Sequence, residues 1–105
     1  MPIPGVEWDE EKNSINKAFH HIDFEDAQYV FFDSNRIERI DHSTGNVSGE
    51  ERLQTLGMVG KILFVVHTER GENKRLISAR LATKAERRAY NGYYQIDGSG
   101  WHKAS

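Results

Sequence analysis

The chain has 105 residues and no cysteine, so it can form one domain with a core, while disulfides, cysteine-ligated zinc and thiol nucleophiles are excluded. No apolar run approaches the roughly 20 residues of a membrane-spanning helix, and the N-terminus lacks the features of a secretory signal, which predicts a soluble, cytoplasmic protein. Residues 1–50 carry four lysines and arginines against eleven acids, and residues 51–105 carry ten against five, which gives a net charge of −2. The basic half either meets a polyanionic partner or neutralises the acidic half within the fold.

Two helices are predicted in the first third of the chain. Asp9 and Asp23 are suitable N-cap residues, and each is followed by acids in the first turn, where the helix dipole favours them. The first helix ends at His20 and His21, where a histidine gains from the dipole without needing any further role. The second helix runs from Phe24 to about Phe32.

Four apolar residues follow the period of the first helix, namely Trp8, Ile15, Phe19 and Ile22. They recur at spacings of seven, four and three residues, which places them on one helical face. We therefore expect this face to pack in the core.

The middle of the chain predicts an antiparallel meander. A candidate strand at 36–41 is followed by a polar loop, at 41–50, that is either mobile or the tip of a hairpin. Three further strands are predicted, at residues 52–58, 61–69 and 74–81, with a tight turn at Val59-Gly60 and a short reversal at 70–73. The strand at 61–69 begins apolar on both faces, so it should be central.

The last predicted element is a helix that begins at a capping box, Thr83-Lys84-Ala85-Glu86, and runs to about Tyr93. We expect one domain over residues 1–93 and a flexible tail over 94–105. The predicted class is α+β, an antiparallel β-meander with two N-terminal helices packed on one face and a C-terminal helix.

Charged residues of the meander form the candidate site, namely Arg52, His67, Glu69, Arg75 and Arg80. Neighbouring strands lie about 5 Å apart, so such residues can surround one phosphate. Cleavage of RNA through the ribose 2′-hydroxyl needs a base, an acid and positive charge on the phosphorane, and histidine, glutamate and arginine supply these without a metal. The alternative is structural: paired or solvated arginines, and a histidine whose ring nitrogens are satisfied internally.

No glycine-rich nucleotide loop, dinucleotide fingerprint or zinc-hydrolase histidine pair is present, and we expect no metal and no other cofactor.

Several stretches carry a resemblance in the expected order. They are Val-Glu-Trp-Asp-Glu-Glu-Lys at 6–12, Asn16 and His20, Asp-Phe-Glu-Asp-Ala at 23–27, Val-Phe-Phe-Asp at 30–33, Gly-Glu-Glu-Arg at 49–52, Val-Val-His-Thr-Glu-Arg at 65–70, Ile-Ser-Ala-Arg at 77–80 and Ala-Thr-Lys-Ala-Glu-Arg-Arg-Ala-Tyr at 82–90. This series resembles the BrnT family. The chain departs from it at Phe19-His20-His21, where the family commonly has Lys-His-Gly, so the first helix must end differently.

The resemblance implies a RelE-like fold and a toxin of a bacterial type II toxin–antitoxin pair. It implies metal-independent endoribonuclease activity that inhibits translation. It also implies a cognate BrnA-like antitoxin, a small ribbon-helix-helix protein that neutralises the toxin, binds operator DNA and represses the operon. No membrane partner is implied.

The site residues implied by position are Lys12, Arg52, Glu69, Arg75, Ser78 and Arg80, with His67 where the family often has an aromatic residue or histidine. We expect RNA to lie across the basic sheet face. Catalysis is assigned to His67, Glu69, Arg75 and Arg80, with the arginines on the scissile phosphate and either His67 or Glu69 as the base. RNA binding is assigned to Lys12, Arg52, Ser78 and Lys84, which predicts salt-sensitive affinity.

Two structural alternatives stay open at these positions: Arg80 can pair with Glu86 at the helix entry, and Ser78 can simply be a small strand residue. The alternative function is a non-catalytic binding module that acts through a DNA-binding partner in transcriptional autoregulation.

Overall fold

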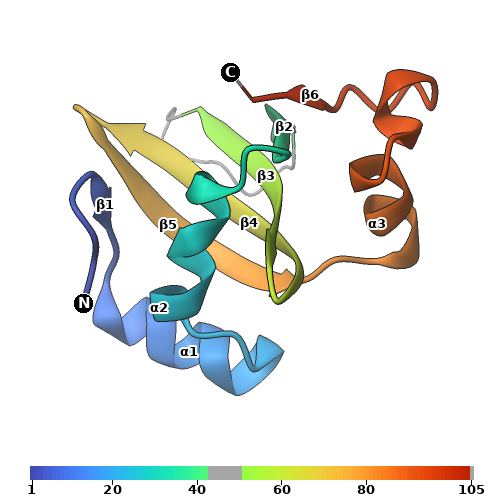
Figure 1. Ribbon diagram of the computed structural model, residues 1–105. Helices are drawn as coiled ribbons and strands as arrows, with labels where there is room; N and C mark the ends of the chain where they lie inside the picture. The colour runs from blue at the N-terminus through green and yellow to red at the C-terminus, as the bar shows by residue number, and fades with distance from the viewer. Residues whose placement is uncertain (43–50, 105) are drawn as a thin grey trace.

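The computed structural model describes residues 1–42 and 51–104. Within them a six-stranded sheet has the order β1-β5-β4-β3-β2-β6, with β1 parallel to β5 and the other pairs antiparallel. The strands are β1 (Val6–Glu7), β2 (Ile37–Ile40), β3 (Arg52–Val59), β4 (Lys61–Arg70), β5 (Asn73–Leu81) and β6 (His102–Lys103). The helices are α1 (Glu10–His20), α2 (Phe24–Ala27) and α3 (Lys84–Tyr90), with 3₁₀ segments η1 (Gln28–Phe32) and η2 (Tyr93–Gln95) (Figure 1). The fold is of the predicted α+β class.

The meander of β3, β4 and β5 forms as predicted, because its turns are encoded locally. Gly60 and Gly71 take φ values of +71° and +61°, the left-handed region that favours glycine, and each reverses the chain between two strands. The strand β4 is central in the meander, with β3 on one side and β5 on the other. The loop predicted at 41–50 lies mostly outside the described residues, because only its first two residues are included.

Each face of the sheet carries one hydrophobic core. The first core joins the sheet to α2 and η1, and its buried members are Val6, Phe24, Ala27, Val30, Leu63, Val65, Leu76 and Ala79. The second joins the sheet to α3 and the C-terminal segment, and its buried members are Ile37, Leu56, Ile62, Phe64, Val66, Ala82, Ala89 and Trp101. The sheet is therefore the middle layer, with α2 and α3 on opposite faces (Figure 1).

A β-bulge changes the expected alternation of β5. The pairing passes from Val66 opposite Ser78 to His67 opposite Leu76, so Ile77 is an extra residue on β5. Leu76 consequently faces the first core, on the opposite side of the sheet from Ser78 and Arg80.

The packing of the predicted apolar face is confirmed only in part, because Trp8 and Ile22 pack against the first core but the two residues between them do not. Ile15 and Phe19 are 53% and 77% exposed, and the buried residues of the helix are Asn13 and Asn16. Asn16 binds the edge of β5 as a neighbouring strand would, because its Oδ1 accepts from the Ala79 N–H at 3.0 Å and its Nδ2 donates to the Ala79 carbonyl at 2.9 Å. Amide pairing, rather than an apolar face, therefore attaches α1 to the sheet.

The end of α1 does not show the different conformation that we expected where the chain has His21 in place of the family's glycine. His21 takes φ +60°, the left-handed conformation usually given to a glycine, and its N–H donates to the Lys17 carbonyl at 2.9 Å. The segment predicted as one helix from Phe24 to Phe32 divides into α2 and the 3₁₀ segment η1.

The C-terminal segment is attached to the sheet, in contrast to the flexible tail that we expected at 94–105. Trp101 is 5% exposed and meets Phe64 edge to face at 6.3 Å, and β6 pairs with β2. An indole buried against the second core explains this attachment, since it is among the largest apolar side chains. No helix among the described residues is long and apolar enough to cross a membrane.

Candidate functional site

Four arginines project from the face of the sheet that carries the second core. Arg52, Thr68 and Arg75 are paired at one level across β3, β4 and β5. Arg39 is paired with Gln54, and Arg80 with Phe64 of the second core. Residues paired in this way point to the same face, so the register gathers Arg39, Arg52, Arg75 and Arg80 there. We call this side of the sheet, defined by these four residues, the arginine face.

Two of these arginines are held by carboxylates. Arg75 Nη1 donates to Glu7 Oε2 at 2.8 Å, and hydrogen bonds from Asn73 and Arg75 hold the pKa of Glu7 below its ordinary value. Arg80 binds Glu86 in bidentate fashion at 2.8 and 3.0 Å and lies 3.9 Å above the centre of the Phe64 ring. The pairing of Arg80 with Glu86 is thus confirmed.

Glu86 connects Arg80 to the start of α3. The carboxylate accepts from the Thr83 N–H at 2.8 Å, and the Glu86 N–H donates to the Thr83 hydroxyl at 3.2 Å, which is the predicted capping box. Burial alone would raise the pKa of Glu86, but the hydrogen bonds from Arg80 and Thr83 outweigh it and the pKa is lowered. The carboxylate therefore stays ionised and fixes the Arg80 guanidinium.

Arg75 and Arg80 do not converge on one phosphate. They lie opposite Thr68 and Phe64, four residues apart on β4, which corresponds to about 13 Å along the strand. Arg52 and Arg75 are two strand spacings apart, about 10 Å. These cations therefore suit successive phosphates of a chain better than a single one.

His67, which we predicted as a catalytic group, is a core residue in the structure. Its side chain is fully buried, with Nε2 at 2.8 Å from Thr55 Oγ1 and its ring edge-on to Phe31 at 4.9 Å. Burial, with a smaller contribution from the charge of Lys74, lowers the pKa of His67 to about 3. A neutral imidazole under η1 cannot reach RNA.

Glu69 lies on the same side of the sheet as His67. Alternation along β4 points it away from Thr68 and the arginine face, and Lys74 Nζ donates to its carboxylate at 3.0 Å. The sheet therefore separates the predicted catalytic group in two, with His67 and Glu69 on one face and the arginines on the other.

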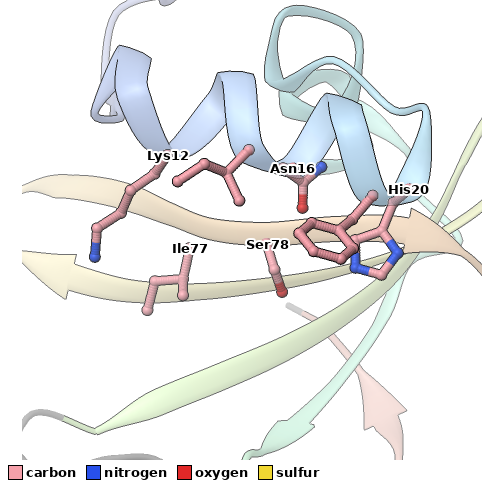
Figure 2. Close-up of a pocket in the computed structure, with 7 residues that line it drawn as sticks. Lys12, Asn16, His20, Ile77 and Ser78 are labelled. Atoms are coloured by element: carbon pink, nitrogen blue, oxygen red, sulfur yellow. The ribbon is translucent and has the colours of Figure 1, made fainter.

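A groove between α1 and β5 brings together two other predicted residues, Lys12 and Ser78. It has a volume of about 360 Å³, and its lining residues are Lys12, Ile15, Asn16, Phe19, His20, Ile77 and Ser78. Figure 2 shows Lys12, Asn16 and His20 along the side of α1 that faces β5, next to Ile77 and Ser78. We call it the α1–β5 groove.

The groove adjoins the arginine face through β5. Ser78 is paired with Val66, which belongs to the second core, so its side chain points to the same face as that of Arg80 two residues later. Lys84 stands apart from the groove, as the exposed first residue of α3. Among the described residues, no three His, Cys, Asp or Glu side chains are arranged to hold a metal ion.

Comparison with known proteins identifies the family. Residues 8–86 match the family described as "Ribonuclease toxin, BrnT, of type II toxin-antitoxin system". The chain belongs to the BrnT family. The matched stretch contains every residue predicted for the site, from Lys12 to Lys84.

A solved BrnT structure has a similar fold. The crystal structure of the Brucella abortus ribonuclease toxin BrnT is 25% identical in sequence to this chain, with a TM-score of 0.54. The match covers 75% of this chain and 96% of that one. No curated protein sequence matches the chain.

Sequence reasoning did not place His20 in the groove, because we had assigned it only to the end of a helix. The signal was present in the spacing, because Lys12, Asn16 and His20 follow one another at four-residue intervals and so share one side of α1. Only the docking of Asn16 on Ala79 shows that this side faces β5.

Proposed function

We propose that this BrnT family member is a metal-independent endoribonuclease with a RelE-like fold that cleaves RNA in the cytoplasm and thereby inhibits translation. The observation that carries the proposal is the arginine face with the α1–β5 groove at its edge. Four arginines supply charge for several phosphates, and the groove supplies His20, Lys12 and Ser78. Family membership supports ribonuclease activity.

The reaction needs the groups that this surface offers. His20 accepts the proton of the ribose 2′-hydroxyl, and the 2′-oxygen attacks the adjacent phosphorus. The bond from phosphorus to the 5′-oxygen breaks as that oxygen takes a proton from Lys12, leaving a 2′,3′-cyclic phosphate and a 5′-hydroxyl. Arg80 and Arg75 stabilise charge on the phosphate backbone, so a metal is not required for that purpose.

The remaining predicted residues bind RNA in this proposal. Ser78 donates a hydrogen bond to the phosphate backbone beside the groove. Arg52 contacts the backbone across the sheet, and Lys84 contacts it beyond the start of α3. Affinity should fall with salt, because each neutralised phosphate releases counterions.

The partner we propose is a BrnA-like ribbon-helix-helix antitoxin, which neutralises the toxin and carries the complex to operator DNA. Membership of a type II toxin–antitoxin family supports an antitoxin. A non-catalytic binding module is the second candidate. It is favoured by the pairing of Arg75 with Glu7 and of Arg80 with Glu86, which occupies both guanidinium groups.

The experiment is cleavage of a defined RNA by the purified protein in EDTA, with end analysis of the products. His20→Gln, Arg75→Ala and Arg80→Ala should each abolish cleavage, whereas Lys61→Ala, an exposed cation at the β3–β4 turn, should not. Thermal melting of each variant separates lost chemistry from lost folding. Cleavage that needs added magnesium would overturn metal independence.

If the protein cleaves RNA neither alone nor with translating ribosomes present, the binding module is favoured. Products with a 3′-hydroxyl would reject attack by the 2′-oxygen, because that attack leaves a cyclic phosphate.

A further inference from the structure

The α1–β5 groove has an apolar wall that the cleavage chemistry does not use. Phe19 is 77% exposed and Ile15 is 53% exposed, although both are large apolar side chains, and Ile77 is half-buried beside them. Large apolar groups exposed together in a groove mark a binding surface more often than single ones do. The wall is therefore a candidate binding surface.

The polar lining of the groove indicates the chemistry of that occupant. None of the lining residues is acidic, and Lys12 and His20 are its basic members. The Asn16 amide is already engaged by the main chain of Ile22 and Ala79, at 2.9 to 3.0 Å, so it serves structure. The groove thus combines an aromatic ring and an aliphatic wall, from Phe19 and Ile77, with a hydroxyl and a cation, from Ser78 and Lys12. These groups match a nucleotide, whose base is flat and apolar and whose phosphate is anionic.

The size and position of the groove agree with this interpretation. Its volume of about 360 Å³ lies at the lower end of the range for small-molecule sites, which suits one nucleotide of a longer chain. Ser78 lines the groove and Arg80 follows two residues later on the same face, so a nucleotide seated there leads its neighbouring phosphates to the arginine face.

We propose that the α1–β5 groove is a nucleobase subsite for single-stranded RNA, in which one unpaired base stacks on Phe19 against Ile77 while Lys12 contacts its phosphate. The proposal rests on the proposed function, because it concerns the same substrate. A base must be unstacked to enter the groove, so single strands bind and duplexes do not. Stacking tolerates any base, so we expect only a modest preference among bases, set by how strongly each base stacks on Phe19.

The test measures binding of a 2′-O-methyl RNA oligonucleotide, which lacks the attacking hydroxyl, by fluorescence anisotropy with the full chain. Phe19→Ala should weaken binding about tenfold, the effect of removing one stacking contact, and Phe19→Trp should restore it. Phe32→Ala is the matched control, because Phe32 is 69% exposed on η1, and it should leave binding unchanged. A duplex of the same sequence should bind weakly.

A second measurement separates stacking from charge. Lys12→Ala should reduce the slope of log affinity against log salt by about one, and Phe19→Ala should leave that slope unchanged. If the wild type cleaves RNA but Phe19→Ala and Phe32→Ala change RNA binding equally, the subsite is overturned. The proposed function then still stands. If the wild type neither cleaves nor binds RNA, both the subsite and the proposed function are overturned.

The competing occupant is the antitoxin. If Phe19→Ala abolished binding to the antitoxin but left RNA binding unchanged, the groove would be a protein interface and the nucleobase subsite would be rejected.

Discussion

Replacement of Asn16 by alanine tests how α1 and the groove are held in place. The side chain makes three hydrogen bonds with main-chain groups at a site that is 5% exposed: to the Ile22 carbonyl at 2.9 Å, to the Ala79 carbonyl at 2.9 Å and from the Ala79 N–H at 3.0 Å. Each bond contributes about 1 kcal/mol net, and groups left unpaired in a buried site add a further cost of about 1–3 kcal/mol. The higher helix propensity of alanine recovers about 0.5 kcal/mol.

We therefore expect Asn16→Ala to lower the free energy of unfolding by about 4 kcal/mol, a large part of the roughly 5–15 kcal/mol of a typical domain. The assay is urea unfolding followed by tryptophan fluorescence, with linear extrapolation to water. The control is Ser14→Ala, an exposed change on the same helix that should alter stability by less than about 0.5 kcal/mol. A loss below about 1 kcal/mol for Asn16→Ala, or one equal to the control, would refute amide pairing as the attachment of α1.

Two further outcomes follow from the buried residues. The pKa of His67 is about 3 in the folded protein and 6.5 in the unfolded chain, so between these pH values only the unfolded chain binds the proton. This contribution to the free energy of unfolding is therefore fully present above pH 6.5 and is lost by about 1.4 kcal/mol per pH unit below it. Urea unfolding should show that the free energy of unfolding is about 2 kcal/mol lower at pH 5 than at pH 7. His67→Gln should remove this difference, whereas the exposed His102→Gln should not. The same pH dependence in His67→Gln would contradict the assignment to His67. Trp101→Ala should destabilise the protein by about 3–5 kcal/mol in the same assay, whereas the exposed Ile96→Ala should have little effect, and equal losses would contradict the packing of the C-terminal segment.

The order of the meander strands and of the main helices could be predicted because its signals are local. Gly60 and Gly71 mark the turns of the meander, and Thr83 with Glu86 marks the start of α3, each within a few residues of the structure it specifies. The series of motifs likewise predicted the BrnT family, which the match over residues 8–86 confirms. Local patterns therefore predicted the class of fold, and the resemblance carried by the motifs predicted the family.

The composition of the site depended on contacts between distant residues. A one-residue bulge opposite His67 decides which side chains of β5 share a face, and the packing of η1 over His67 turns a candidate base into a core residue. The same holds for α1, whose apolar spacing predicted a core face, while the amide of Asn16 instead pairs with Ala79, 63 residues away, and leaves Phe19 exposed. The sequence by itself determined the main elements and the family, because their signals lie in residues that are neighbours along the chain. The tertiary structure decided which residues meet at the groove and the arginine face. Faces and burial depend on pairing between strands and helices that are far apart in sequence.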